Sequence, residues 1–298
     1  MTLFKVLLLY SLTVLIWGST WLAITYQLGV VDPMVSVAYR FGLASVFAFI
    51  VCAVMGMPLT IERRHHGFIV LQGLLVFGLN YWLIYISETQ LTSGLVAVIF
   101  STIVIMNMVN SRLFFKSKIH GLAVVGALVG LLGVTLLFWP EISVISLRDQ
   151  NFSAMLICLL AVFSASLGNM VMARNQVHKL PVLQVNAYGM LYGSLGLVVV
   201  AILRGQRFDW DPSLSFNLSL FYLSVFGSIV AFWSYTSLIR EIGVEKAGYS
   251  ALVIPVVALA LSTVVENYQW TLLAVVGLLL ILFGNYLVMK KPKTVLNQ

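Results

Sequence analysis

The chain has 298 residues, of which 61% are hydrophobic and 9% are charged, and its mean hydropathy is +1.02. Soluble domains hold about 45–50% apolar residues, so this composition excludes a water-soluble protein and predicts one that lies in a lipid bilayer. The formal net charge of +7 comes from scattered Lys and Arg residues without a clustered basic run, which argues against a nucleic-acid partner.

Ten apolar runs follow one another along the chain, each roughly 20 residues long. In hydrocarbon every backbone N–H and C=O must be paired within the protein, so continuous runs of this length are spanning helices. A membrane β-barrel would instead show alternating segments of about ten residues. The predicted helices are residues 4–26, 34–56, 67–87, 93–114, 120–138, 152–173, 182–203, 217–239, 245–265 and 271–289.

The basic residues between these runs fall mainly on one side of the membrane. If the amino terminus is cytoplasmic, 13 of the 17 Lys and Arg residues lie on that side, and Arg148, Arg204 and Arg207 lie outside. Cytoplasmic connections are enriched in Lys and Arg, so we expect both termini in the cytoplasm. The acids expected in outside connections are Asp32, Glu88, Glu141, Asp149, Asp209, Asp211 and Glu266.

Two stretches of the chain repeat one another. Residues 122–137 read LAVVGALVGLLGVTLL and residues 273–288 read LAVVGLLLILFGNYLV, with nine of 16 positions identical. At similar offsets, VFG at 76–78 recurs at 225–227, Pro33 corresponds to Pro181, and Gly94 corresponds to Gly248. These anchors predict two five-helix halves, residues 1–139 and 152–298 with a short basic tail, joined by an outside connection at 140–151.

Because five is an odd number, the second half enters the membrane upside down relative to the first. We therefore predict an all-α polytopic protein whose ten transmembrane helices form two inverted repeats, a design in which secondary transporters build two exchangeable states. Gly126, Gly130 and Gly133 give the fifth helix a face at which another backbone can approach closely. The fifth and tenth helices have almost no polar side chain in their middles, so we expect packing or dimer contacts there.

Several motifs carry a family resemblance. The first helix holds Trp17-Gly18-Ser19-Thr20-Trp21, Arg40 follows Pro33 by seven residues, and Ala247-Gly248 leads to Pro255, with Gly277 and Gly284 in the last helix. These features resemble the drug/metabolite transporter superfamily, in particular its ten-helix EamA-type exporters, over the whole chain. The chain is most similar to the YddG-type amino-acid exporters, whose substrates include aromatic amino acids. The resemblance implies an exporter of the bacterial inner membrane.

Pro255 lies inside the ninth predicted helix. Proline has no amide hydrogen, so it leaves a carbonyl without its helical partner and kinks the helix, which suits a gating element. Ser101 stands at the corresponding position of the first half. We therefore expect the two halves to kink unequally.

Arg40 is the one charged residue placed well inside a predicted helix. A charge at the bilayer centre costs at least about 2.5 kcal/mol, so such a residue is a candidate for function. One interpretation is an anchor for a substrate carboxylate. The other is a structural arginine that snorkels or bonds to helix-end carbonyls, and both stay open.

The remaining candidates are uncharged polar and aromatic side chains near helix middles. Trp17 and Trp21 share a helix face at i, i+4, and Ser166 and Asn169 share one at i, i+3. Rings that stack on an apolar side chain, with amides and phenols for an ammonium and a carboxylate, suit a small zwitterion. The competing interpretation is that such residues anchor interfaces and hold helices together. The candidate substrate-binding residues are Trp17, Trp21, Tyr39, Arg40, Asn80, Tyr81, Ser166, Asn169, Asn186, Trp233 and Tyr249.

Other chemistries find little support. No carboxylate is expected in the middle of a helix, which argues against a glutamate-gated cation antiporter. The sequence holds no G-x-S-x-G, no H-E-x-x-H and no helix with two acids, so a membrane enzyme is a remote alternative. We interpret the four histidines as solvated residues of cytoplasmic connections, and we expect neither a metal nor a cofactor, since the spacing of a zinc site is missing. These histidines are His65, His66, His120 and His178.

Together these features predict a secondary transporter that exports amino acids, chiefly aromatic or hydrophobic ones, or related small zwitterions by alternating access. A multidrug or toxic-cation efflux carrier of the same fold is the alternative. The expected partners are a small-molecule substrate and the lipid bilayer, and the expected state is a homodimer or a monomer.

Overall fold

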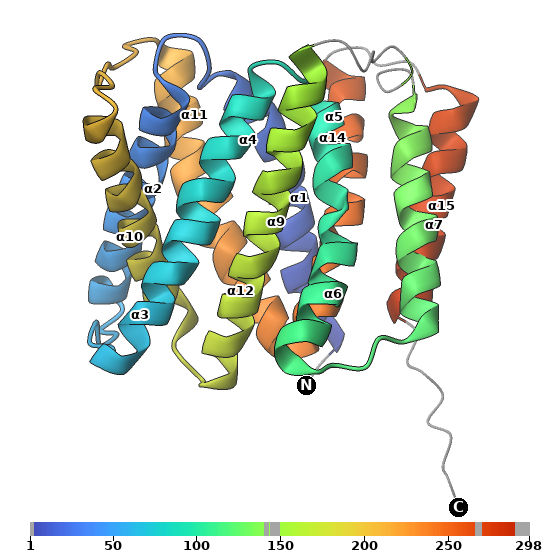
Figure 1. Ribbon diagram of the computed structural model, residues 1–298, viewed down its shortest axis with the longest axis horizontal. Helices are drawn as coiled ribbons and strands as arrows, with labels where there is room; N and C mark the ends of the chain where they lie inside the picture. Colours follow the sequence, from blue (N-terminus) through green and yellow to red (C-terminus); the bar gives the residue numbers. More distant parts are fainter. Residues whose placement is uncertain (1–2, 140–142, 144–149, 266–269, 290–298) are drawn as a thin grey trace, which may run out of the picture.

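The structure is a computed structural model that describes residues 3–139, 143, 150–265 and 270–289. Within these residues every regular element is a helix, as the composition predicts (Figure 1). Glu141, Arg148, Asp149, Glu266 and the basic tail from Lys290 lie outside the described residues. In chain order the elements are α1 (Leu3–Thr25), α2 (Pro33–Val54), α3 (Arg63–Gln72), η1 (Gly73–Asn80), α4 (Tyr81–Glu88), α5 (Ser93–Ser101), α6 (Ile103–Phe115), α7 (Gly121–Leu137), α9 (Gln150–Val177), α10 (Val182–Leu203), α11 (Leu214–Ser224), η2 (Val225–Val230), α12 (Ala231–Ile242), α13 (Val244–Gly248), α14 (Ser250–Val265) and α15 (Leu272–Met289).

Most of these elements join into stretches that can cross a bilayer. Helices α7 and α15 are apolar but shorter, with 17 residues in α7. At 1.5 Å per residue, α7 is about 26 Å long, slightly less than the roughly 30 Å hydrocarbon core. A polytopic helical protein is thus confirmed, while ten as the number of spans stays a prediction. In the described part of the chain the eight stretches long and apolar enough to span are Leu3–Thr25, Pro33–Val54, Arg63–Glu88, Leu95–Phe115, Phe152–Val177, Val182–Leu203, Leu214–Ile242 and Val244–Leu261.

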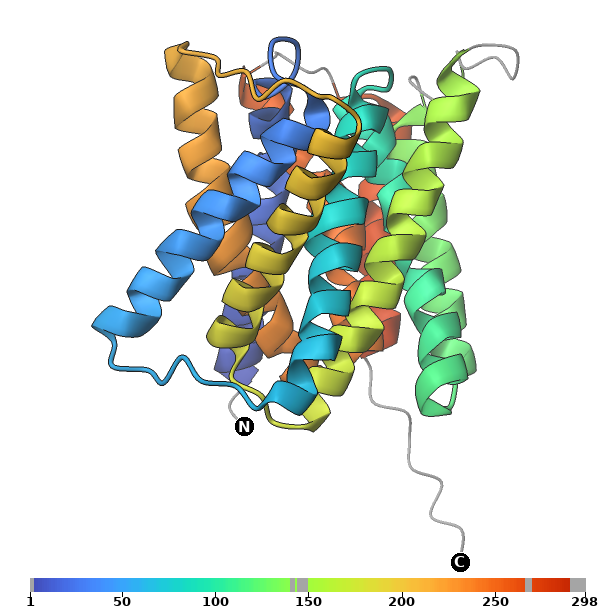
Figure 2. The same ribbon diagram turned by 60° about the vertical axis from the view of Figure 1, so that its left-hand side comes forward.

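The long helices run alternately up and down a common axis (Figures 1 and 2). Helix α1 begins and α15 ends at the same end of the bundle, which is lowermost in Figure 1 and which we call the lower end. The opposite end is the upper end. The sequence predicts that the lower end faces the cytoplasm. Pro33 was expected in a connection but begins α2 at the upper end. A proline at the first position of a helix loses no helical hydrogen bond. Asp32 caps the helix there, since its Oδ1 accepts a hydrogen bond from Met34 N at 2.8 Å.

The third and eighth predicted helices each contain a π-helical segment. Segment η1 lies between α3 and α4, segment η2 lies between α11 and α12, and each contains one copy of the Val-Phe-Gly repeat. Such segments are rare and occur frequently at functional sites. Segment η1 also packs closely on α10, since a Cβ built on Gly73 would lie 2.4 Å from Gly189 O. The repeat therefore marks an irregular turn at corresponding positions of the two predicted halves.

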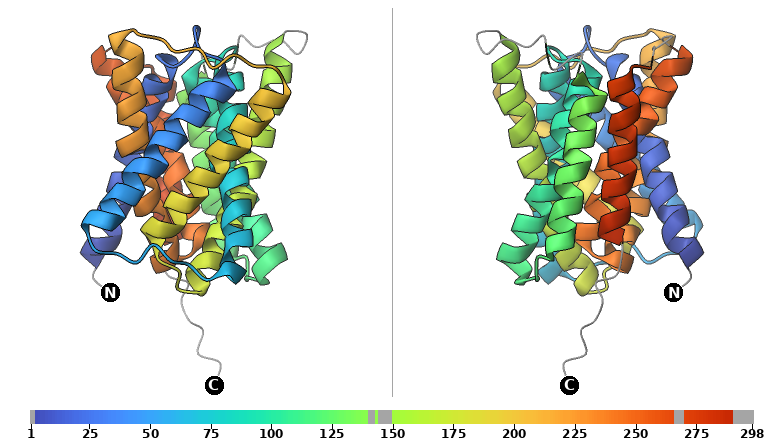
Figure 3. Two further views of the ribbon diagram at one scale, coloured as in Figure 1. Left: turned by 90° about the vertical axis from the view of Figure 1, so that its left-hand side faces the viewer. Right: turned by 90° about the vertical axis from the view of Figure 1, so that its right-hand side faces the viewer.

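The two longest repeated sequences pack against each other. Helices α7 and α15 contain the two copies and lie side by side in opposite directions (Figure 3). Their contact is made at glycines: a Cβ built on Gly126 would lie 2.7 Å from Gly284 O, and one built on Gly133 would lie 2.7 Å from Gly277 O. Small residues let helix backbones touch in this way. The expectation that these helices serve in packing is confirmed.

The glycine contacts are exchanged between the two copies. In the aligned repeat Gly126 corresponds to Gly277 and Gly133 corresponds to Gly284. In space, however, Gly126 packs on Gly284 and Gly133 packs on Gly277. A twofold axis between α7 and α15 would produce this pattern, because such an axis maps each contact onto the other. The inverted repeat stays a prediction, and exchanged contacts are what it requires.

We expect Gly133→Ala to destabilise the protein, because the added methyl group would meet Gly277 O and Ile281 N, which are backbone atoms that cannot rotate away. Overpacking of this kind costs about 1–3 kcal/mol, so the melting temperature of the detergent-solubilised protein should fall measurably. Gly121→Ala is the control on the same helix, because its Cβ would have no neighbour within 4 Å. Equal melting temperatures for the two variants would contradict the glycine contact.

Candidate functional site

A small cavity lies where helices of both predicted halves meet. Its volume is about 60 Å³, which has room for a few water molecules because about 10–15 Å³ holds one. Helices α1, α4, α5, α6, α9, α12, α13 and α14 and segment η1 all contribute to its wall. No Lys, Arg, Asp, Glu or His from the described residues lines the cavity.

Aromatic rings make up much of the cavity wall. Trp17 lies edge-on to Phe232 and tilted against Tyr235, with ring centroids 5.0 Å apart in both pairs. Trp21 lies edge-on to Phe100, with centroids 6.0 Å apart. Edge-to-face pairs contribute about 0.5–1.5 kcal/mol beyond the burial of their area. Rings from α1 therefore connect to α12 on one side and to α5 on the other.

Several polar groups in the wall are bonded to nearby backbone. Trp17 Nε1 donates to Gly227 O at 3.3 Å, and Asn80 Nδ2 donates to Ala161 O at 2.8 Å. Trp21 differs, because its Nε1–H is buried and finds no acceptor among the described residues. An unpaired buried donor costs about 1–3 kcal/mol. Trp21 therefore brings to the cavity wall a buried donor that has no acceptor among the described residues.

Buried amides close the cavity towards the lower end. Asn169 Nδ2 donates to Tyr235 OH at 3.1 Å and to Asn107 Oδ1 at 3.4 Å. Asn110, one turn after Asn107 in α6, donates through Nδ2 to Ser166 Oγ, one turn before Asn169 in α9, at 2.9 Å. Hydrogen bonds between polar side chains thus join helices α6, α9 and α12. The same side chains can bond to a polar solute instead of to one another.

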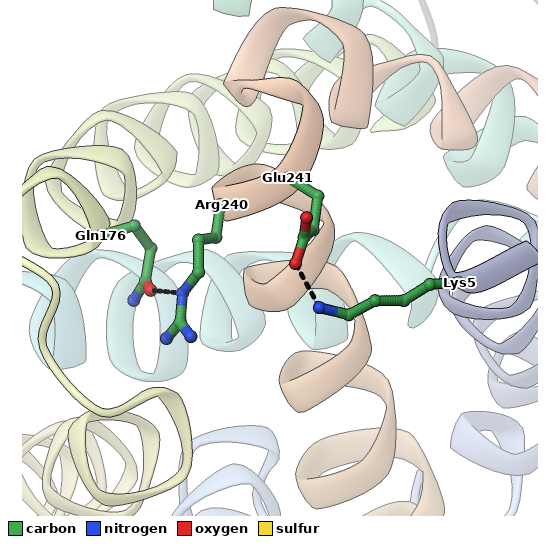
Figure 4. A network of polar contacts seen from close by, with 4 residues as sticks. All are labelled: Lys5, Gln176, Arg240 and Glu241. Carbon is green, nitrogen blue, oxygen red and sulfur yellow. Dashed lines mark hydrogen bonds and ion pairs between the residues drawn. The ribbon is translucent and has the colours of Figure 1, made fainter. Parts of the chain in front are cut away.

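A larger pocket of about 570 Å³ lies below these amides, at the lower ends of α6, α9, α12 and α13. Figure 4 shows two contacts at this end: Arg240 Nε donates to Gln176 Oε1 at 2.7 Å, and Lys5 forms an ion pair with Glu241. The first contact links α12 to α9 and the second links α12 to α1. Exposed ion pairs contribute only about 0–1 kcal/mol, so Lys5 can separate from Glu241 at little cost.

Arg40 lies behind the wall towards the upper end and is fully buried, so it does not snorkel. Its Nε donates to Ser228 Oγ at 3.2 Å and its Nη2 donates to Gly227 O at 3.3 Å, both in η2. Its Nη1 donates to Tyr85 OH at 3.4 Å. The guanidinium carbon lies 4.5 Å from the ring centroid of Tyr81, which lines the cavity. Arg40 therefore supports the wall through Tyr81 and is not itself part of it.

Pro255 lies inside α14, so Ala251, four residues earlier, has no helical amide partner for its carbonyl. Ser101 Oγ lies 3.1 Å from Ala251 O and 2.9 Å from Ala97 O, and it can donate to either. Ser101 is the residue that corresponds to Pro255 in the first half. The first half thus supplies the hydrogen bond that the proline removes from the second, and a gating role for Pro255 stays a prediction.

The structure brings together five of the predicted substrate-binding residues. These residues come from α1, η1, α4 and α9, and they face one cavity although up to 152 positions separate them in the chain. They are Trp17, Trp21, Asn80, Tyr81 and Asn169.

The other predicted residues lie away from the cavity. Ser166 and Arg40 are in the contacts described above. Tyr39 OH donates to a carbonyl of the upper connection, Asp209 O, at 3.2 Å. Tyr249 OH donates to a carbonyl of α7 at 2.8 Å, and Asn186 is bonded to side chains of α3 and α12. Trp233 has 42% of its surface exposed.

Sequence reasoning missed several residues of the wall. Phe232 and Tyr235 lie three positions apart and so share one face of α12, whereas Trp233 follows Phe232 directly and points elsewhere. The i, i+3 spacing of the two rings was the available signal. The missed residues that carry a ring or a hydroxyl group are Thr20, Phe100, Phe232, Tyr235 and Ser250.

Two side chains expected in solvated connections are buried. His65 is 5% exposed, and its ring centroid lies 5.6 Å from that of His178. Glu88 is 8% exposed. The expectation is wrong for both because the third span covers Arg63–Glu88 instead of 67–87, which carries these residues into the bundle. Within the described residues, no three His, Cys, Asp or Glu side chains gather as metal ligands would.

Comparisons with known proteins show similarity over nearly the whole chain. The sequence profile of the EamA-like transporter family matches residues 4–139 and again residues 152–290. The chain is 30% identical to the "Uncharacterized inner membrane transporter YedA" of Escherichia coli K12, over 93% of this chain and 90% of that protein. It is 24% identical to the "Uncharacterized transporter YoaV" of Bacillus subtilis strain 168, over 95% and 96%. A solved crystal structure with 16% sequence identity has the same fold, with a TM-score of 0.80 over 97% of both chains.

We expect Ser101→Ala to lower the free energy of unfolding by about 1 kcal/mol or more, because the Ala251 carbonyl would lose its side-chain donor. In the Pro255→Ala background, residue 255 regains an N–H for that carbonyl. Ser101→Ala should then lower the free energy of unfolding by a smaller amount. Denaturation of the four proteins measures the coupling between the two sites. Equal costs in both backgrounds would rule out this role for Ser101.

Proposed function

The chain belongs to the EamA-like transporter family, and we propose that it exports amino acids, chiefly aromatic or hydrophobic ones, or related small zwitterionic metabolites. The observation that carries this proposal is the uncharged cavity walled by aromatic rings where the two halves meet. The family and the names of its relatives favour a transporter over an enzyme. The name of the Escherichia coli relative supports an inner-membrane location.

We infer alternating access between two inverted halves, with ten spans and both termini in the cytoplasm. The family profile matches twice, over segments close to the predicted halves. The exchanged glycine contacts of α7 and α15, and the π-helical segments at corresponding positions, also support a duplicated and inverted unit. Two halves of nearly equal shape can rock about a shared central site and open it to one side at a time.

The cavity wall offers partners for each part of an apolar amino acid. The N–H of Trp21 has no acceptor among the described residues and can donate to a carboxylate once the cavity widens. The amide oxygen of Asn169 and the hydroxyl oxygen of Tyr235 can accept from an ammonium group. The rings of Trp17 and Phe232 provide a surface for an apolar side chain, with aromatic rings favoured by edge-to-face contact. These are weak, uncharged contacts, and a carrier that must release its solute benefits from them.

Substrate entry requires the cavity to widen, since about 60 Å³ is too small for an amino acid. The lower side is better suited to opening, because hydrogen-bonded amides close the cavity there and the 570 Å³ pocket lies beyond them. Towards the upper end the wall is apolar, with Ile24 and Ile84. An exporter loads from the cytoplasm, which the sequence predicts at the lower end.

A toxic-cation carrier is the second candidate. Aromatic faces attract organic cations by about 0.5–2 kcal/mol, and Trp17, Trp21 and Tyr81 present such faces. A cation that leaves water also needs a negative partner to offset its lost hydration. Since no described carboxylate lines the cavity, an amino acid suits it better.

We expect Trp17→Ala and Asn169→Ala each to reduce counterflow of a labelled aromatic amino acid in reconstituted vesicles by about tenfold or more. The first loses a ring surface and the second a polar partner, and each 1.4 kcal/mol of lost binding corresponds to a factor of ten. Trp139→Ala is the control, because Trp139 is 45% exposed, lies two residues beyond the end of α7 and does not line the cavity. Unchanged counterflow in both cavity variants would remove this cavity as the transport site.

A binding scan separates the two candidate substrates. The measurement is the quenching of the intrinsic tryptophan fluorescence of the protein as a solute is added. We expect an aromatic amino acid to quench it to saturation, because rings surround Trp17 and Trp21 and the solute would stack among them. Threonine should bind more weakly, since it offers no ring, and tetraphenylphosphonium should not bind at comparable concentrations. Preference for the phosphonium cation would instead favour the efflux of toxic cations.

A further inference from the structure

Glu88, the last residue of α4, has a buried carboxyl group outside the cavity. Its side chain is 8% exposed, and neither Oε1 nor Oε2 has a hydrogen-bond partner among the described residues. A carboxylate removed from water is stable only when it is paired or hydrogen-bonded, and otherwise it takes up a proton. The surroundings of Glu88 are therefore those of a protonated carboxyl group.

The charged and titratable groups near Glu88 come from α2, α4 and α9. Arg40 on α2 is the cation within electrostatic reach of the carboxyl group. Tyr85, one turn earlier in α4, and Cys158 on α9 are also within reach. The other two elements packed against α4 are η1 and α5, and neither contains a titratable side chain. Among the described residues, the charged group that acts on Glu88 is thus Arg40. Arg40 is also the residue that connects α2 to η2.

Arg40 does not bond to Glu88 in this structure. Two of its nitrogens donate to Ser228 Oγ and Gly227 O of η2, in the second half, and the third donates to Tyr85 OH. Tyr85 and Glu88 lie three positions apart on the same face of α4. Because guanidinium is always charged, it is drawn towards whichever acceptor carries more negative charge. Its present acceptors are all neutral.

We propose that Glu88 is a proton-binding site whose occupancy decides which half of the protein Arg40 holds. With the proton bound, Glu88 is neutral and Arg40 remains bonded to η2. When the proton leaves for solution, the carboxylate attracts the guanidinium, which exchanges Ser228 and Gly227 for a charge-assisted bond to Glu88. Arg40 and Glu88 both belong to the first half, so deprotonation releases the second half at this point. This inference rests on the proposed transport function and names a proton as its coupled ion.

A pocket at the upper end offers the proton a route. It has a volume of about 560 Å³ and is lined by Thr89, the residue that follows Glu88. Two carboxylates and one guanidinium line the same pocket, those of Asp32, Asp209 and Arg207. Exchange at Glu88 would therefore occur with the upper side, which the sequence predicts to be outside the cell.

Infrared spectroscopy of the purified protein tests the site without any substrate. We expect the C=O stretch of a protonated carboxyl group in the spectrum of the wild-type protein at neutral pH, and its loss in Glu88→Gln. Glu62→Gln is the matched control, because the Glu62 side chain is 67% exposed and pairs with Arg64. The band should persist in that variant. A band that is absent from the wild-type protein, or present unchanged in Glu88→Gln, would overturn the proton site.

Transport of labelled L-tryptophan in vesicles tests the coupling. If one proton is exchanged per substrate, a gradient of one pH unit can support up to about tenfold accumulation in wild-type vesicles. We expect the ratio of fluxes with and without the gradient to fall to about one in Glu88→Gln and to be kept in Glu62→Gln. A ratio of one in wild-type vesicles, or equal ratios in wild-type and Glu88→Gln vesicles, would overturn the coupling. Counterflow of an amino-acid panel without a gradient tests the transport proposal separately, since its complete absence would remove that proposal while the infrared band would still report the proton site.

Discussion

The pairing of backbone carbonyls in a solvent without water is the constraint on which the rest of this structure depends. Every helix that departs from the regular ladder releases a carbonyl, and hydrocarbon cannot satisfy it. Here side chains of the opposite half do so. Ser101 of the first half bonds Ala251 O, which Pro255 leaves without its amide, and Ser164 of the second half bonds Leu75 O in η1. Because lipid tails supply no hydrophobic force between helices, such bonds and close packing hold the halves together.

The same irregular turns organise the cavity. The Gly227 carbonyl in η2 accepts from both Arg40 and Trp17, so one released backbone group positions a buried cation and a ring of the cavity wall. A glycine suits this position because a Cβ there would lie 2.9 Å from the Thr20 side chain. By contrast, α7 and α15 are regular, lack residues in the cavity wall, and pack through glycine. The regular helices α7 and α15 therefore provide packing, whereas the helices interrupted at η1, at η2 and at Pro255 all contribute to the wall of the site.

The sequence predicted the helices well, because hydropathy reports directly on contact with lipid. Helix α10 covers Val182–Leu203, as predicted. The prediction was weaker where a span carries charge at its end. The third helix was predicted to lie between charged residues, yet the span includes Arg63, Arg64 and Glu88. Glu88 is buried by neighbouring helices. Hydropathy cannot anticipate this, since the environment of a helix end depends on what packs beside it.

The sequence by itself determined that the chain is a helical membrane protein and that two of its stretches repeat, since composition and periodicity are properties of the chain alone. For the site it proposed aromatic and polar side chains together with Arg40. Tertiary structure alone decided which side chains share a cavity. Trp17, Asn80 and Asn169 come together, whereas Trp233 lies outside and Phe232 takes its place, because one residue along a helix turns a side chain by about 100°. Only the packed structure shows that Arg40 bonds to η2 and that the Glu88 carboxyl group finds no hydrogen-bond partner among the described residues, since such pairings join segments far apart in the chain.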